Sequence, residues 1–289
     1  MHEESSPPHN DAGADRRAAR PAAIRLAEAG LLLGLIATVA VLTVNVWLVA
    51  RLTGQQQQGS RERAFWVLCQ PGHTPAERAS AFLQLAAAGN KEWRSADLRE
   101  LNLPGLKLPG ADLQGALFHN ANLAGAKLAG ARVAKGSFAQ ADLGGADLSE
   151  ADLSEVLFYR TKLTQANLRQ AKLRAAHLQE AQAEQADLMM ADLSDADCLM
   201  ANLAGAKLNG ANLTGAKLEA TLFRGANLSL ARLDGANLKD ADFTNTNWWR
   251  ARGLTSEQIE LLKKKFAPTE GAGPTLKEDY EKWAGGRPR

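Results

Sequence analysis

Carboxylates that recur at five-residue intervals are the side chains of this sequence best suited to chemistry. They form two runs: Asp142, Asp147 and Asp152, followed by Asp187, Asp192 and Asp197. Carboxylates that meet in space can bind a divalent cation or act as a general acid and base. The two runs could do so only if a step of five residues returned the chain to the same face of the fold.

Other residues with catalytic or metal-binding potential are few. The chain has only two cysteines, too few for a disulfide framework or a cysteine-rich zinc site. Cys69 and His73 lie four residues apart, but no further metal ligand is near them. His177 has no evident nucleophile beside it, and the common nucleotide-binding, zinc-protease and hydrolase motifs do not occur. We therefore expect no catalytic, cofactor or metal site, and a protein that is not an enzyme.

Composition excludes further classes of protein. A length of 289 residues allows one or two domains, and 45% hydrophobic with 23% charged residues is an ordinary globular balance. The 34 Lys and Arg residues nearly balance the 32 Asp and Glu residues, which leaves a net charge of +2. This balance argues against a protein that binds nucleic acid by electrostatic attraction.

A five-residue repeat runs without insertion from Ala96 to Arg250, which makes 31 pentads. The first position is Ala in 24 pentads, the third is Leu or Phe in 27, and the second is Asp or Asn in 17. A period of five fits neither an α-helix nor a β-strand. Short extended segments joined by turns would keep Ala and Leu inside at every step, which predicts a solenoid of stacked coils.

The tandem motif A-(D/N)-L-x-x, as in the ANLAG of residues 121–125 and the ANLKD of residues 236–240, resembles the pentapeptide-repeat family. The resemblance covers slightly over half of the chain. It implies a β-solenoid, namely a right-handed quadrilateral parallel β-helix with four pentads, or twenty residues, in each coil. Members of this family share a shape more than an activity. Some members bind DNA gyrase by imitating DNA.

With twenty residues per coil, two residues that are five positions apart would lie on different faces. The two aspartate runs would then not cluster, which excludes a carboxylate metal site or an acid–base pair built from them. Residues twenty apart would instead stack at about 4.8 Å. One column of second positions alternates in charge and predicts a structural charge ladder: Asp112, Arg132, Asp152, Lys172 and Asp192.

Outward apolar residues indicate where a partner could dock. Leu117 and Leu157 would share one face two coils apart, about 10 Å. Tyr159 lies beside Leu157 in the same pentad. These three residues are the candidate docking face for a protein partner, whose identity the sequence does not name.

The turns occupy the last two residues of each pentad. Pro104-Gly105 and Pro109-Gly110 predict type II turns, because Gly readily adopts a positive φ. No pentad ends in Gly between Ala146 and Met200. We therefore expect type II turns near the two ends of the rod and type I-like turns in the middle.

Both ends of the solenoid, expected over residues 96–250, would be open sheet edges that need covers. A helical neck over residues 61–95 contains a strong helix start at residues 74–77, and a capping helix is expected over residues 251–267. Residues 268–289 are expected to be a mobile tail.

The N-terminal residues predict a membrane anchor. We expect a disordered tail over residues 1–25, a transmembrane helix over 26–51 and a Gln-rich linker over 52–60. The apolar stretch from Ala29 to Ala50 would span about 33 Å, enough for a bilayer core of ~30 Å. A cleaved signal peptide is the alternative, although its apolar region is usually shorter. Four arginines before the stretch and three after it favour a single-pass protein with a cytoplasmic N-terminus and the repeats outside.

One face of the predicted transmembrane helix could bring two chains together. Gly30 and Gly34 form a G-x-x-x-G pair, which Thr38 and Asn45 extend along the same side. Glycine is also common in membrane helices, so the pattern leaves a homodimer open rather than requiring it.

The function predicted from these features is that of a non-enzymatic, membrane-tethered scaffold for protein–protein interaction, without a cofactor. The alternative is inhibitory or protective binding of a target such as DNA gyrase. A DNA imitation needs an acidic stripe, and the mixed charge of the repeats argues against one.

Overall fold

The computed structural model describes residues 63–64, 67–68, 72–269 and 272–286. The chain divides into two units, residues 1–62 and 63–289, and the described residues all belong to the second. The N-terminal tail, the transmembrane helix with its Gly30–Gly34 face, and the linker lie outside the described residues. Among the helices that the structure does describe, none is long and apolar enough to cross a membrane.

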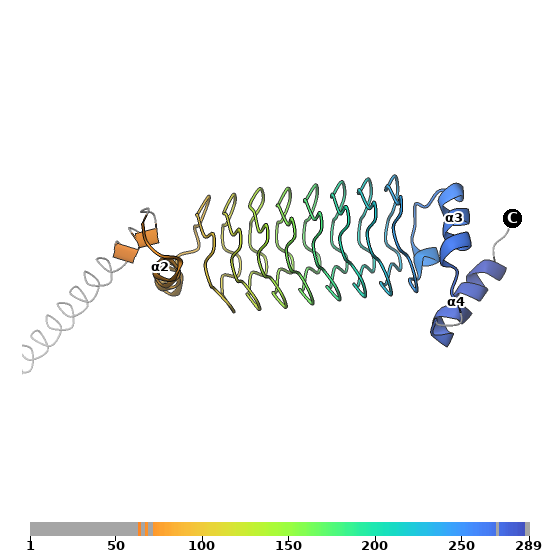
Figure 1. Cartoon of the computed structure of the whole chain (residues 1–289), viewed down its shortest axis with the longest axis horizontal. Coiled ribbons are helices and arrows are strands. Elements are labelled where there is room, and N and C mark those ends of the chain that lie inside the picture. Colours follow the sequence, from red (N-terminus) through yellow and green to blue (C-terminus); the bar gives the residue numbers. More distant parts are fainter. Residues whose placement is uncertain (1–62, 65–66, 69–71, 270–271, 287–289) are drawn as a thin grey trace, which may run out of the picture. The chain divides into compact units, whose positions relative to one another are not determined.

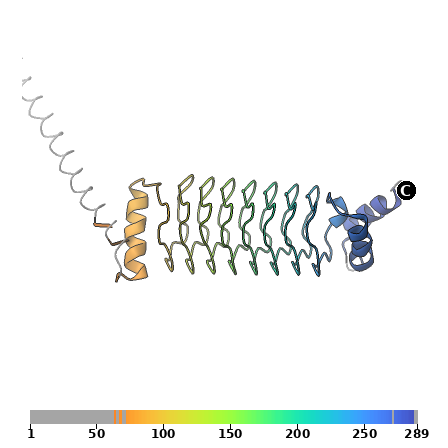
Figure 2. The same ribbon diagram turned by 90° about the horizontal axis from the view of Figure 1, so that it is seen from above.

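Stacked coils of twenty residues form the body of the second unit, as Figures 1 and 2 show from two directions. Parallel β-bridges join residues twenty apart, beginning with Glu92 and Asp112 and ending with Arg232 and Arg252. Each pentad from residues 91–95 to residues 241–245 contributes one bridge residue, and the described residues contain isolated bridges rather than continuous strands. The expected β-solenoid is therefore confirmed. It starts with the pentad at residues 91–95, one pentad before the start expected at Ala96.

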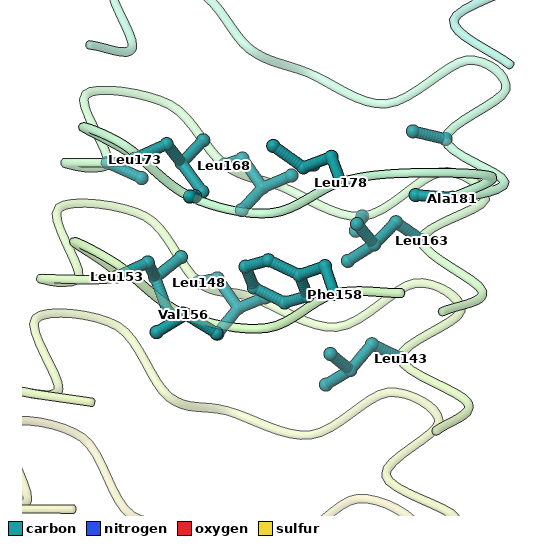
Figure 3. Close-up of a cluster of buried hydrophobic side chains, with 14 of the residues drawn as sticks. Leu143, Leu148, Leu153, Val156, Phe158, Leu163, Leu168, Leu173, Leu178 and Ala181 are labelled. Atoms are coloured by element: carbon teal, nitrogen blue, oxygen red, sulfur yellow. The ribbon is translucent and has the colours of Figure 1, made fainter. Parts of the chain in front are cut away.

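The core is a set of vertical columns inside the coils. We number the residues of each pentad 1 to 5, with the repeated Ala at position 1 and the repeated Leu at position 3. Both positions point inward and are almost completely buried. Figure 3 shows Leu153 beneath Leu173 and Phe158 beneath Leu178 in successive coils. The ring of Phe158 also continues a stack of phenylalanines, with centroids 4.8 and 5.4 Å apart.

Backbone hydrogen bonds between coils use three of the five N–H groups of a pentad. In the pentad at 121–125, the amides of Leu123 and Gly125 donate to carbonyls of the next coil, at 2.7 and 2.8 Å. The amide of Asn122 donates to a carbonyl of the previous coil at 2.9 Å. The N–H at position 1 closes the turn within the coil, so only the N–H at position 4 has no backbone acceptor.

The side chain at position 2 satisfies this remaining donor. The amide of Gly144 donates to Oδ1 of Asp142 at 2.9 Å, and the amide of Ser154 donates to Oδ1 of Asp152 at 3.2 Å. Asn does the same through its amide oxygen, for example Asn122 to the amide of Ala124 at 3.1 Å. Asp and Asn are the residues that make such short side-chain turns best. This bond explains why they dominate position 2.

The prediction of two kinds of turn is wrong. The residue at position 5 has a positive φ in every pentad from Ser95 to Asn245, whether it is Gly or not. Glu150, for example, has φ 58°, close to the 63° of Gly145. The position 1 amide donates to the position 3 carbonyl across every corner from Leu103 onward, which together with the positive φ at position 5 is the pattern of a type II turn. The cause is the twenty-residue register, which requires the same corner everywhere and overrides the local preference of the residue.

A helix covers the N-terminal end of the coils. Helix α2 (Pro75–Ala87) begins at the predicted start, where Thr74 and Glu77 form a reciprocal capping box. Its Phe82 packs on Trp93 of the first coil, with ring centroids 4.4 Å apart. This contact covers the apolar end of the core, which would otherwise face water.

Two helices cover the C-terminal end, where the 3-10 helix η1 (Trp248–Arg250) replaces the last corner. Helix α3 (Ser256–Phe266) lies in the segment where we expect a capping helix, and Thr255 caps it. Its Phe266 meets Phe243 of the last coil with centroids 6.0 Å apart.

Residues 274–285 are not the mobile tail that we expect, because they form helix α4 (Pro274–Gly285). Asp279 of α4 accepts hydrogen bonds from Nε1 of Trp249 and Nε of Arg250, both at 2.8 Å. Tyr280 packs against Trp249 with ring centroids 5.0 Å apart, and Trp283 packs against Trp248 at 5.4 Å. The aromatic pairs join two segments about thirty residues apart, so neither segment alone indicates the contact.

Removing the side-chain acceptor at position 2 should destabilise the rod. Asp152→Ala leaves the amide and the hydroxyl of Ser154 without their acceptor, and Asp152 forms no ion pair with any residue that the structure describes. We expect the free energy of unfolding to fall by about 1 kcal/mol. Urea denaturation measures the change. Lys172→Ala, which alters the next residue of the same column, is the control and should have little effect. Equal losses for the two variants would contradict this role.

The coil at residues 171–190 should be the weakest part of the rod. Ala183 is the only Ala at position 3 and is 1% exposed, between Leu163 and Leu203 in its column. Leu-to-Ala changes in cores cost about 2–5 kcal/mol, depending on how well the surroundings collapse. We expect residues 180–200 to open first in hydrogen exchange.

Ala183→Leu should raise the melting temperature and slow this opening. Cys198, in the next coil, provides a second measurement, because burial raises the pKa of its thiol to about 12 and keeps it unreactive. Thiol labelling of Cys198 should therefore require local opening and should be slower in the variant. A lower melting temperature would mean that neighbouring side chains already fill the space.

Candidate docking face

One face of the rod carries all three residues of the candidate docking face. It consists of the pentads that begin at residues 96, 116, 136, 156, 176, 196, 216 and 236, and we call it the Leu157 face. Positions 2 and 4 both project from a face. Side chains eighteen residues apart show this directly, because His119 at position 4 meets Ser137 at position 2 of the next coil, with Nε2 and Oγ 3.0 Å apart.

The three residues differ in how far they reach into solvent. Leu117, Ser137 and Leu157 follow one another in the position 2 column. Leu157 is 41% exposed and Tyr159 is 37% exposed, whereas Leu117 is half-buried. The exposed centre of the face is therefore the Leu157–Tyr159 pair, and Leu117 extends it by two coils.

The middle of the Leu157 face has no charged side chain. We consider the four pentads of this face that begin at residues 116, 136, 156 and 176. Their positions 2 and 4 hold only Leu117, His119, Ser137, Ala139, Leu157, Tyr159, His177 and Gln179. The other three faces carry three to five Asp, Glu, Lys or Arg residues at the corresponding eight positions. Leu199 continues the apolar surface in the next coil and is also exposed.

Charged residues line both edges of this surface. Along one edge, Nζ of Lys135 lies 3.9 Å from a carboxylate oxygen of Glu155. Along the other, Nε of Arg160 donates to Oε2 of Glu180 at 2.6 Å. The guanidinium of Arg160 also lies 5.0 Å from the centre of the Tyr159 ring. The contact with Arg160 holds Tyr159 in place, and the two ion pairs give the apolar centre a polar rim.

This surface can be recognised in the sequence when the outward residues are aligned in columns with a period of twenty. The three candidate residues stand out one by one as apolar side chains at outward positions. The lack of charge at the residues around them becomes visible only when both outward columns are aligned. His119 belongs to the surface for this reason, although it is not apolar, and its ring lies against the buried Ser137.

The contact between His119 and Ser137 does not form a catalytic pair. A serine nucleophile must reach its substrate, but Ser137 is only 2% exposed. A base also needs a partner that orients its second nitrogen, and Nδ1 of His119 is buried without a hydrogen-bond partner. The two side chains therefore do not have the arrangement of a nucleophile and its base.

The five residues of the predicted charge ladder lie in one column, but ion pairs join few of them. Asp112 accepts from Nη2 of Arg132 at 3.2 Å and from Nε of Arg94 at 2.6 Å. Within the described residues, no ion pair joins Asp152 to Arg132 or to Lys172. Asp152 bonds Ser154 instead, at both its amide and its hydroxyl. Local hydrogen bonds thus account for more of this column than charge alternation does.

The aspartate runs do not form a metal site in the part of the chain that the structure describes. Asp142, Asp147 and Asp152 project from three successive faces, in bridges to different columns. No group of three or more His, Cys, Asp or Glu side chains that could hold a metal ion occurs among the described residues.

Comparison with known proteins identifies the repeats. The family model described as pentapeptide repeats matches in eight copies, over residues 93–133, 137–174, 171–210 and 211–247. These ranges include more than half of the 289 residues. No curated protein matches the chain in sequence.

Several solved pentapeptide-repeat structures are similar to this chain. One is HetL of the cyanobacterium Nostoc sp. strain PCC 7120, which is involved in heterocyst differentiation regulation and is 28% identical to this chain. The match covers 58% of this chain and 95% of HetL, with a TM-score of 0.19. A protein of the Arabidopsis thaliana thylakoid lumen is 24% identical; the match covers 65% of this chain and 91% of that protein, with a TM-score of 0.24. QnrB1, a plasmid-mediated fluoroquinolone resistance protein, is 21% identical; the match covers 58% of this chain and 96% of the QnrB1 chain, with a TM-score of 0.26. Because the family model matches over half of its length, this chain belongs to the pentapeptide-repeat family.

Proposed function

We propose that this protein is a non-catalytic, membrane-tethered scaffold that binds another protein through the Leu157 face. The observation that carries the proposal is the charge-free surface around Leu157 and Tyr159, which lies between two charged edges. Protein interfaces commonly have this anatomy, with an apolar centre and a polar rim.

The rod suits this role because its binding groups are already in place. Every coil is bonded to its neighbours through the backbone, and Tyr159 is held by Arg160. A rigid surface loses little conformational entropy when a partner binds. Tyrosine is also among the residues that contribute most to binding energy at interfaces.

The membrane tether rests on the sequence of residues 26–51. The apolar stretch from Ala29 to Ala50 is long enough to span a bilayer, and the arginines around it favour a cytoplasmic N-terminus. In this arrangement the Gln-rich linker would hold the rod near the outer surface of the membrane.

Gyrase binding is the alternative, and the charges of the rod argue against it. Imitation of DNA requires a continuous acidic stripe, but the column that contains Asp112 and Asp152 also contains Arg132 and Lys172. Purified protein should therefore leave DNA supercoiling by gyrase unchanged. Inhibition or protection of gyrase at stoichiometric concentration would favour the alternative function.

Membrane extraction tests the tether. The full-length protein should remain with the membranes after an alkaline carbonate wash. Ile36→Arg combined with Val39→Arg places two charges at the centre of the apolar stretch, at about 2.5–3.5 kcal/mol each, and should release the protein. Ala22→Arg with Ala23→Arg, before the stretch, is the matched control and should stay in the pellet. Extraction of the wild-type protein would show that the tether is wrong.

The proposed binding surface should tolerate substitution without loss of folding. Leu157→Glu alters an exposed side chain and should change the free energy of unfolding by no more than about 0.5 kcal/mol. Phe158→Ala, at the adjacent inward position, removes a fully buried ring and should lower it by about 3–5 kcal/mol. Urea denaturation of both variants measures the difference. A large loss in Leu157→Glu would mean that the Leu157 face stabilises the rod itself.

A further inference from the structure

The two outward columns of the Leu157 face are related in a way that suits a two-fold axis. Suppose that two rods lie side by side, with their Leu157 faces in contact and their N-terminal ends together. A two-fold axis parallel to the rods then relates the copies. At each level, position 2 of one copy faces position 4 of the other, and each edge of the face meets the opposite edge of the second copy.

The apolar residues match under this operation. Leu157 of each copy faces Tyr159 of the other, twice at the same level. Leu117 likewise faces His119 two coils below. At the level between them Ser137 is buried against His119, so only the small side chain of Ala139 faces the second copy. Four successive levels would thus be closed without burying an Asp, Glu, Lys or Arg side chain.

The charged edges match as well. Glu155 and Arg160 lie on opposite edges of the Leu157 level, so Glu155 of one copy faces Arg160 of the other, twice. Towards the C-terminal end, Lys217 at position 2 of each copy faces Glu219 at position 4 of the other copy. Opposite charges on the rim of an interface favour the correct register and disfavour others.

The reverse orientation matches less well. An antiparallel pair that brought the two Leu157–Tyr159 pairs together would set Glu155 against Glu155 and Arg160 against Arg160. Like charges in contact are unfavourable. The antiparallel pair would also place the two N-terminal ends at opposite ends of the assembly, which the proposed tether of both chains to one membrane disfavours.

We propose that a second copy of this chain occupies the Leu157 face, packed in parallel so that Leu157 of each copy contacts Tyr159 of the other. This proposal names the partner of the scaffold and rests on the proposed function for its orientation. A standard interface buries about 800 Å² on each partner, more than a few coils of one narrow face provide. Confinement to one membrane would favour the pair, because tethering raises the effective concentration of one copy around the other.

Cysteine cross-linking of the full-length protein in its membranes tests the contact. Two differently tagged chains, one with Leu157→Cys and one with Tyr159→Cys, are co-expressed in a Cys69→Ser background; Cys198 can remain because it is buried. A short bis-maleimide should cross-link this mixed pair several-fold more than it links either variant to itself. The matched control is Lys162→Cys with Thr164→Cys, which occupy positions 2 and 4 of the next face in the same coil.

Each outcome decides the proposal. A mixed cross-link above both same-residue cross-links supports the parallel pair. A dominant Leu157→Cys cross-link to itself would indicate the antiparallel pair and overturn it. Cross-linking no stronger than in the Lys162→Cys and Thr164→Cys control would also overturn it and leave the face to another protein. Membrane sedimentation of the same samples tests the tether separately, because loss of the protein from the membrane fraction contradicts the proposed function whatever the cross-links show.

Discussion

The backbone hydrogen bonds between neighbouring coils are the interaction on which the rest of the structure depends. They join residues nineteen or twenty-one positions apart and hold residues twenty apart in register. This register turns the Ala and Leu positions inward, and it stacks the outward residues in straight columns. It also leaves the position 4 amide without a backbone acceptor, and the Asp or Asn that occupies position 2 in 17 of the 31 pentads supplies one.

The same bonds explain how the corners tolerate residues that avoid a positive φ. A left-handed backbone conformation is unfavourable for residues other than Gly, by about 1–2 kcal/mol each. Glu150, Met190 and others nevertheless adopt it, because each corner amide donates to the adjacent coil and the turn closes on position 3. Such a ladder needs covered ends, and the aromatic contacts of α2, α3 and α4 provide them.

The five-residue period predicts most of the fold, because the repeated Ala and Leu report directly on the inward positions. It does not predict the corners, since at Glu150 the local preference of the residue opposes the register of the whole rod. Helix α4 is missed for a different reason: Trp249 and Tyr280 are informative only as a pair. At the candidate site, single exposed residues such as Leu157 can be found from the pattern. The charge-free surface around Leu157 depends on the alignment of two columns, and the membrane anchor lies outside the described residues.

The twenty-residue register also constrains how a chain of this kind can vary in length. Insertion or deletion of one pentad would leave every corner and every inward Ala or Leu as before. It would, however, turn all residues beyond it by one face, so that Leu117 and Leu157 would no longer share a surface. Only the gain or loss of a whole coil keeps the columns aligned. The core would therefore accept changes in length in steps of five residues. A surface such as the Leu157 face is kept only when the change is a multiple of twenty.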